Sequence, residues 1–296
     1  TRQRRVPMLL YLPKGAAGAR PLVLMSHGAG GSRRANHAQS RHLASHGFAV
    51  LALEHVGSDT ARLLRGGNWM ANLREMISDR DELLARPRDV RFALDMAQQW
   101  TEGGTALRGR LDLTRAALVG HSYGAYTALV GCGARGALDW MVPPSGRGLA
   151  ADESDPRLKA CVAYSPQGPG EPFFLDSSYA SIRRPVLHVS GSRDQLLGGR
   201  PPLQRQQAFD RSPPGGHVLL WLAHADHSAF SDPTGSGQNG LPSAARADAQ
   251  PVTRAATLAF LQRELLDRAD ADAHLTQGSL QALRRGIVDD IEVRRR

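Results

Sequence analysis

A serine between two glycines is the pattern in this chain that points most directly to chemistry. Ser122 lies in the pentapeptide GHSYG at 120–124, after the apolar run 116–119 and before the apolar run 125–130. We interpret the first run as a buried strand and the second as a buried helix, with the serine in a tight turn between them. The two glycines leave the backbone room to close, and the helix N-terminus directs its amides toward the hydroxyl. A serine held in this way can act as a nucleophile.

A serine hydroxyl becomes a good nucleophile only beside a base, and candidate partners follow two later strands. Asp194 comes after the apolar run 185–190 in the turn GSRD, and His227 lies in the loop after the run 217–222. Because the carboxyl ends of parallel strands meet at one edge of a sheet, we expect both side chains to meet Ser122 there. An imidazole can take and return the serine proton, and a carboxylate can orient the imidazole. The pattern predicts Ser122, His227 and Asp194 as nucleophile, base and acid.

Other residues compete for these roles. His224 lies in the same loop as His227 and is the second candidate base. Asp226 is a weaker candidate acid because adjacent side chains seldom face one another. Asp155 and Asp176 follow other segments and rank below it.

A glycine-rich loop, HGAGGS at 27–32, follows the apolar run 22–25. A strand that ends in such a loop presents free backbone N–H groups at the carboxyl edge of the sheet, where they can stabilise a developing oxyanion. The second donor in such sites is the residue after the nucleophile. We therefore expect the N–H groups of Ala29 and Tyr123 to form an oxyanion hole.

Two other groups of side chains could bind a ligand. Trp69, Trp140 and Phe173 lie in segments between the predicted strands and are candidates for the substrate pocket. His42 and His46 have the i, i+4 spacing of a metal site on a helix, but no third ligand is evident. We expect neither a metal nor an organic cofactor.

The composition is that of a globular protein. The chain has 296 residues, of which 41% are hydrophobic, and its net charge of +9 comes almost entirely from arginine. Because the arginines are spread along the chain with no interleaved aromatic stripe, we expect a solvated basic surface and no nucleic-acid partner. No apolar run approaches the roughly 20 residues that span a bilayer. Residues 1–268 are expected to form one catalytic domain, and the polar, basic tail 269–296 a short helix near 279–285 or a partly disordered segment.

The two cysteines and the first residue bear on the compartment. Cys132 and Cys161 lie in apolar runs of a predicted helix and a predicted strand, so we expect buried free thiols rather than a disulfide. The sequence begins at Thr1 rather than Met, which suggests trimming or a removed signal segment. A periplasmic or secreted location is favoured over the cytoplasm.

The alternation of strands with helices predicts an α/β fold with a mostly parallel central sheet and helices on both faces. The segments HGAGGS (27–32), RHLASHGFAVLALEH (41–55), GHSYGAYTAL (120–129), GSRD (191–194) and ADHSAF (225–230) resemble the dienelactone-hydrolase-like branch of the α/β-hydrolases. The segment from 41 is similar to cutinase-type polyester hydrolases and to platelet-activating-factor acetylhydrolase-like esterases. The resemblance covers roughly residues 6–266. It implies the α/β-hydrolase fold, the same Ser122, Asp194 and His227, and the same two oxyanion donors.

The residues and the resemblance together predict a serine esterase that acts on a small-molecule ester through an acyl-enzyme. An amidase or peptidase with the same three side chains is the first alternative, because it differs mainly in the leaving group. A non-catalytic binding protein on this fold is the second alternative. The oligomeric state is not predicted.

Overall fold

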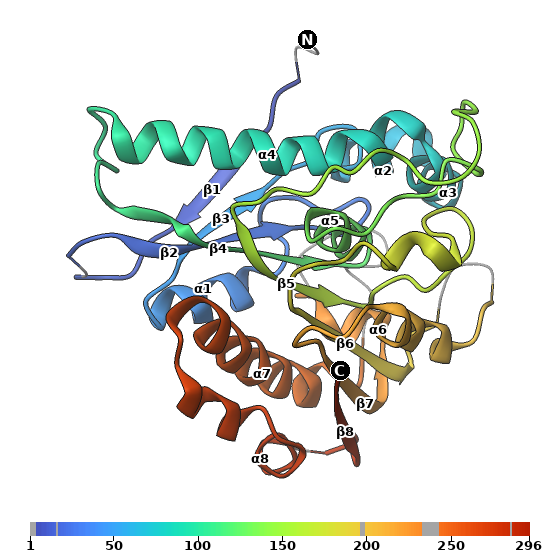
Figure 1. Ribbon diagram of the computed structural model, residues 1–296. Coiled ribbons are helices and arrows are strands. Elements are labelled where there is room, and N and C mark those ends of the chain that lie inside the picture. The colour runs from blue at the N-terminus through green and yellow to red at the C-terminus, as the bar shows by residue number, and fades with distance from the viewer. Residues whose placement is uncertain (1–3, 16, 196–198, 233–242, 285) are drawn as a thin grey trace.

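The computed structural model describes residues 4–15, 17–195, 199–232, 243–284 and 286–296. Its centre is an eight-stranded sheet in the order β1-β3-β2-β4-β5-β6-β7-β8 (Figure 1). The six inner strands are parallel, and only the two outer strands, β1 and β8, pair antiparallel to their neighbours. The strands are β1 (Met8–Tyr11), β2 (Arg20–Ser26), β3 (Ala49–Leu53), β4 (Leu111–His121), β5 (Leu158–Tyr164), β6 (Val186–Arg193), β7 (Val218–Asp226) and β8 (Ile291–Arg295).

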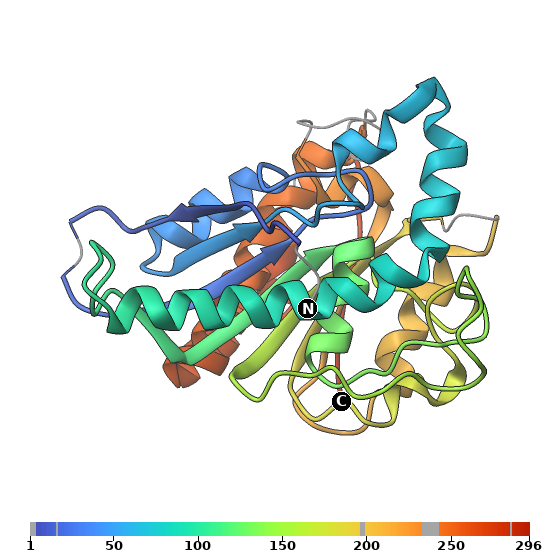
Figure 2. The ribbon, with the colours of Figure 1, turned by 90° about the horizontal axis from the view of Figure 1, so that it is seen from above.

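Helices cover both faces of this sheet (Figures 1 and 2). One apolar core lies between the sheet and α1 (His37–Ser45), α7 (Arg246–Leu266) and α8 (Gln277–Gln281), and a second lies under α2 (Thr60–Leu63), α3 (Trp69–Ser78), α4 (Arg80–Glu102), α5 (Tyr123–Gly131) and α6 (Gln207–Arg211). The inner strands are apolar along most of their length because both of their faces are buried. The predicted mostly parallel α/β sheet is confirmed. Short 3₁₀ turns complete the connections: η1 (Arg65–Gly67), η2 (Asp176–Tyr179), η3 (Pro202–Gln206), η4 (His227–Phe230) and η6 (Ala269–His274).

The C-terminal segment contributes to the sheet, which the sequence analysis did not predict. Residues 269–296 contain η6, the short helix α8 and the edge strand β8. Strand β8 pairs with β7 from Val218 opposite Arg295 to Leu222 opposite Ile291. Three of the five residues of β8 are charged, Glu292, Arg294 and Arg295, so the strand shows no apolar run in the sequence. An edge strand tolerates such charge. Across the described residues, no helix combines the length and apolarity needed to cross a membrane.

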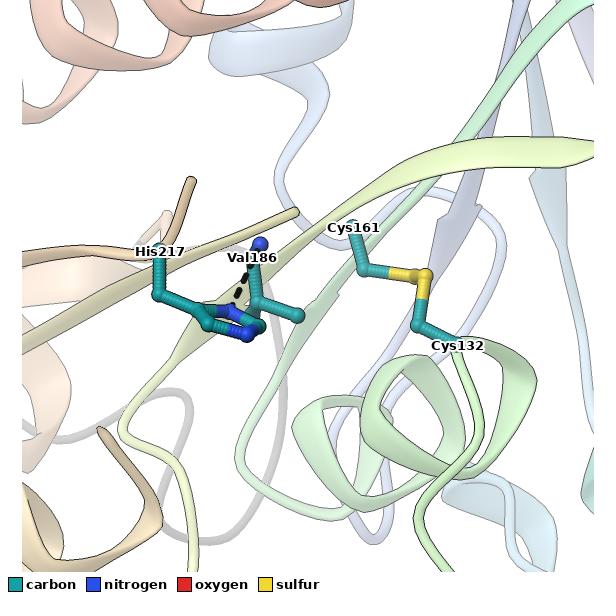
Figure 3. Close-up of a disulfide and its surroundings, with 4 residues drawn as sticks. All are labelled: Cys132, Cys161, Val186 and His217. Carbon is teal, nitrogen blue, oxygen red and sulfur yellow. Dashed lines mark hydrogen bonds between the residues drawn. A yellow bond between two sulfur atoms is a disulfide. The ribbon is translucent and has the colours of Figure 1, made fainter. Parts of the chain in front are cut away.

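The expectation of two free thiols was wrong. Cys132 at the end of α5 and Cys161 on β5 form a disulfide, with their Cα atoms 6.3 Å apart (Figure 3). Helix α5 leaves β4 and packs against β5, the neighbouring strand, and this packing brings the end of the helix within disulfide range. The two residues are 29 positions apart in sequence, so only the tertiary arrangement shows that they meet.

Candidate active site

The turn between β4 and α5 holds Ser122 in a conformation that few residues adopt. Its φ is 57° and its ψ is −117°, a region that costs free energy for a residue with a side chain. A Cβ atom at position 120 would lie 2.0 Å from the carbonyl oxygen of Gly124, and one at 124 would lie 2.0 Å from that of Ser26. Both positions therefore require glycine. The turn exposes the serine side chain at the carboxyl edge of the sheet.

The structure brings Ser122, His227 and Asp194 into one hydrogen-bonded line. Ser122 Oγ lies 2.9 Å from His227 Nε2, and His227 Nδ1 lies 2.8 Å from Asp194 Oδ1. Asp194 directly follows β6, and His227 directly follows β7, the adjacent parallel strand. The carboxylate fixes the imidazole proton on Nδ1, which leaves Nε2 free to accept the serine proton.

Asp194 is fully buried, yet it has three polar partners. Ser190 Oγ donates to its Oδ2 at 2.7 Å, and the Nε of Arg205 lies 2.8 Å from its Oδ1. Burial by itself would raise the pKa of Asp194, but the charge of Arg205, followed by His227, holds that pKa below its usual range. The carboxyl group is therefore ionised at neutral pH. Arg205 also lies 3.1 Å from His227 Nδ1 through its Nη2, so a fixed positive charge is adjacent to both groups.

The loop after β2 presents Ala29 beside the first turn of α5. Neither the Ala29 nor the Tyr123 amide has a hydrogen-bond acceptor in the described part of the chain. The loop is held by the buried ring of His27, whose Nδ1 donates to the Gly28 carbonyl at 2.6 Å while its Nε2 accepts from the His55 amide at 3.0 Å. Burial keeps the pKa of His27 well below its usual value, so this ring stays neutral and shapes the loop.

A buried arginine joins the two segments that carry these amides. Arg86 on α4 donates to the His27 carbonyl, to Thr127 Oγ1 on α5 at 2.9 Å and to Ser58 Oγ at 2.7 Å. Its guanidinium also lies 4.3 Å from the centre of the Tyr123 ring. Burial lowers the pKa of Arg86 to about 10, which leaves it charged at neutral pH. This one side chain fixes the distance between the glycine-rich loop and α5.

A small cavity of about 60 Å³ opens at this point of the sheet. Ser122, His227, Ala29 and Tyr123 line it, together with Phe173 from the predicted set of aromatic residues. Helix α3 stands over the edge toward which the parallel strands run (Figure 2). Two apolar side chains of α3 complete the wall, Leu73 and Ile77.

The other two predicted pocket residues do not line this cavity. Trp69 begins α3 and packs, partly buried, against the core beneath that helix. Trp140 is partly buried in the connection between α5 and β5. Aromatic size alone did not separate pocket residues from packing residues, whereas the i, i+4 spacing of Leu73 and Ile77 was a usable signal for one helical face.

Comparisons with known proteins agree with this fold. The family model "Platelet-activating factor acetylhydrolase, isoform II" matches residues 11–63. A solved structure of a ferulic acid esterase from Streptomyces cinnamoneus superposes with a TM-score of 0.58 at 25% sequence identity, covering 86% of this chain and 69% of that one. The chain has the α/β-hydrolase fold. No curated protein matches it.

The alternative candidates for the base and the acid take part in other interactions. His224 Nε2 lies 3.2 Å from a carboxylate oxygen of Asp289, at the edge of the sheet formed by β8. Asp226 accepts hydrogen bonds from two backbone amides of η4 and so caps the turn that carries the imidazole. Asp155 and Asp176 pair with neighbouring arginines.

Three further histidines lie beside the site or at the C-terminal end of α1. His121 Nε2 donates to the His227 carbonyl at 3.0 Å, and burial together with the charge of His227 lowers the pKa of His121 to about 3. His121 therefore stays neutral and supports the loop. His42 and His46 lie with ring centres 4.4 Å apart. In the part of the chain that the structure describes, no three His, Cys, Asp or Glu side chains are grouped to hold a metal.

Sequence reasoning missed Arg86, Arg205 and Gln167. Gln167 Nε2 donates to the Ser122 carbonyl at 2.7 Å, which ties the loop after β5 to the serine turn. An arginine in a helix or turn is usually solvated, so the sequence carried no signal that these two are buried and charged. Their roles follow from the strands and helices that surround them.

Proposed function

We propose that this α/β-hydrolase is a serine-dependent carboxylic ester hydrolase. The observation that carries the proposal is the hydrogen-bonded line from Ser122 Oγ through His227 to Asp194, at 2.9 and 2.8 Å. Beside it lie two backbone amides that have no acceptor among the described residues. A nucleophile, a base, a group that orients the base and donors for an oxyanion are the parts that acyl transfer needs.

The reaction would proceed in two acyl-transfer steps. Ser122 Oγ attacks the ester carbonyl carbon while His227 Nε2 takes the hydroxyl proton. The carbonyl oxygen becomes an oxyanion that accepts hydrogen bonds from the amides of Ala29 and Tyr123, each contributing about 3 kcal/mol to transition-state stabilisation. The leaving alcohol receives the proton from His227 as the acyl-enzyme forms. Water then attacks the acyl-enzyme by the same route, and Ser122 recovers its proton.

Asp194 would act through the imidazole. Its buried carboxylate holds the Nδ1 proton and stabilises the positive charge that His227 acquires when the serine is deprotonated. The pKa of Asp194 is held below its usual range by Arg205 against the effect of burial, so the carboxylate is available across neutral pH.

The similarities support an ester rather than an amide as substrate. The matched family model is that of an acetylhydrolase, and the similar solved structure is that of a ferulic acid esterase. Matched ester and amide substrates with the same acyl group would test the choice, and equal or faster amide turnover would favour the amidase alternative.

Substitution of the serine tests the mechanism. Ser122→Ala should lower kcat/KM for 4-nitrophenyl acetate by about 10⁴-fold or more, because the remaining site only binds and polarises the ester. The matched control is Ser177→Ala, at an exposed serine of η2, which should leave turnover unchanged. A fluorophosphonate probe should label wild-type Ser122, as read by mass spectrometry of the labelled peptide. Labelling of another serine, or wild-type turnover in Ser122→Ala, would refute the proposal.

A further inference from the structure

A second charged group lies in the cavity wall and has no part in the serine chemistry. Arg200, just before η3, lines the same cavity as Ser122 and His227. The other guanidinium of the cavity, Arg205, is buried and lies 2.8 Å from the carboxylate of Asp194. Arg205 is therefore neutralised by the protein, and Arg200 is the group whose charge needs an explanation.

No carboxylate of the described chain lies within 4.0 Å of Arg200, as an ion pair would require. The residues outside the described ranges add none, because 1–3, 16, 196–198, 233–242 and 285 contain no aspartate or glutamate. The hydrogen bond that the structure gives this side chain is a long one, from Nη1 to the Pro169 carbonyl at 3.5 Å. A guanidinium has five N–H donors, so most of its donors have no acceptor among the described protein atoms.

The backbone of residues 168–170 lies close to this side chain and to the turn that carries it. A Cβ atom at Gly170 would lie 1.7 Å from Arg200 Nη1, and the φ of 128° at this glycine disfavours other residues as well. The Gly170 amide donates to the Phe174 carbonyl at 2.6 Å, which anchors the loop. A Cβ atom at Gly168 would lie 2.1 Å from the Gln204 carbonyl, so the loop also packs closely on η3. The guanidinium is seated against backbone at the cavity rather than free in solvent.

We propose that Arg200 binds a carboxylate of the ester substrate, so that this site favours esters that carry an anionic group. The inference rests on the proposed function, because it assigns a substrate class to the same site. A planar guanidinium matches a carboxylate with two parallel hydrogen bonds, and a charge-assisted contact of this kind is stronger than one between neutral groups. Partial burial of Arg200 in a cavity strengthens the attraction relative to open solvent. The carboxylate can belong to the acyl group or to the leaving group.

Glu171 acts in the opposite direction. This exposed carboxylate lines the same cavity, but no ion pair joins it to Arg200. Its negative charge repels an anionic substrate and lowers the preference that Arg200 creates. Removal of the two charges should therefore shift selectivity in opposite senses, which a general loss of folding or activity cannot imitate.

Two pairs of esters, each differing by one charge, test the inference. The acyl-side pair is 4-nitrophenyl hydrogen adipate and 4-nitrophenyl methyl adipate, and the leaving-group pair is 4-acetoxybenzoate and methyl 4-acetoxybenzoate. The readout is the ratio of kcat/KM for the anionic ester to kcat/KM for its neutral partner. We expect wild type to favour the anion in one pair by about 10- to 100-fold, and that pair identifies which side of the ester carries the charge.

Variants then assign the preference to the residue. Arg200→Gln should reduce the ratio of the two kcat/KM values to about one, and Glu171→Gln should raise that ratio. Arg108→Gln, at an exposed arginine, is the matched control for loss of one positive charge and should change neither ratio. Two results would overturn this inference while leaving the proposed function intact. One is turnover of the neutral esters with no preference for the anion in either pair, and the other is a preference that survives in Arg200→Gln. If the wild-type protein hydrolysed none of the four esters, the proposed function would be overturned and this inference with it.

Discussion

The carboxylate of Asp194 offers a test that separates catalysis from stability. Asp194→Asn keeps the shape of the side chain but removes the charge that pairs with His227 and Arg205, at 2.8 Å from each. Without the carboxylate, the imidazole can adopt the wrong tautomer and its positive form loses its counter-charge. In serine hydrolases this substitution lowers kcat by about 10⁴-fold, equivalent to about 5 kcal/mol of barrier. We expect a loss of about 10³- to 10⁴-fold here.

The same change should also lower stability, because it leaves Arg205 buried without its anion. Removing one partner of a buried pair costs about 3–5 kcal/mol. The backbone carbonyls of Ser165 and Pro166 still accept hydrogen bonds from the Arg205 guanidinium, at 2.8 and 3.2 Å. We therefore expect the free energy of unfolding to fall by about 3 kcal/mol, at the lower end of that range. Urea unfolding measures this loss, and 4-nitrophenyl acetate hydrolysis, in urea-free buffer on folded protein, measures the catalytic one.

Asp226→Asn is the matched control for this experiment. Asp226 is the alternative acid that lies next to His227 in sequence, but its carboxylate caps η4. Asparagine is an equally good cap. Activity and stability of this variant should stay close to wild type. Activity of Asp194→Asn within tenfold of wild type, or an equal loss in Asp226→Asn, would refute the role assigned to Asp194.

Two further predictions concern stability. Replacing both cysteines, Cys132→Ala with Cys161→Ala, should lower the free energy of unfolding by about 3–4 kcal/mol, because the bridge closes a 29-residue loop; an unchanged urea midpoint would contradict this. His188 is fully buried with no hydrogen-bond partner for either ring nitrogen among the described residues, and burial lowers its pKa well below 6.5. The unfolded chain therefore takes up a proton below pH 6.5 that the folded chain does not, so stability falls with acidification by up to about 1.4 kcal/mol per pH unit. His188→Leu should flatten the stability profile between pH 7 and pH 5, and parallel profiles for the two proteins would exclude this explanation.

Local patterns were enough to predict a mostly parallel sheet and the inner strands that carry the candidate site residues. Those strands are buried on both faces, so each appears as an apolar run that ends at a polar loop. The same logic predicted that Asp194 and His227 would follow strands, because chemistry in such sheets gathers at the carboxyl edge. Strand β8 was not predicted, because an edge strand needs little apolar surface and three of its five residues are charged.

Side-chain partners that lie far apart in sequence were beyond such patterns. In the sequence, Arg86 and Arg205 cannot be distinguished from surface arginines. The fold buries both side chains and places their hydrogen-bond and ion-pair partners beside them. The pocket presented the same difficulty. Phe173 reaches the cavity and Trp140 does not, although both are aromatic residues in irregular segments.

The sequence by itself determined which residues could act as nucleophile, base and acid, and that each would follow a strand. Glycine spacing and apolar periodicity, on which this rests, are local properties of the chain. Only the tertiary structure decided which groups meet. Cys132 pairs with Cys161, Arg205 pairs with Asp194, and Arg200 has no ion pair among the described residues. Each of these facts depends on the distance between separate segments after folding. Such distances are set by the packing of strands and helices on one another, and no local pattern encodes them.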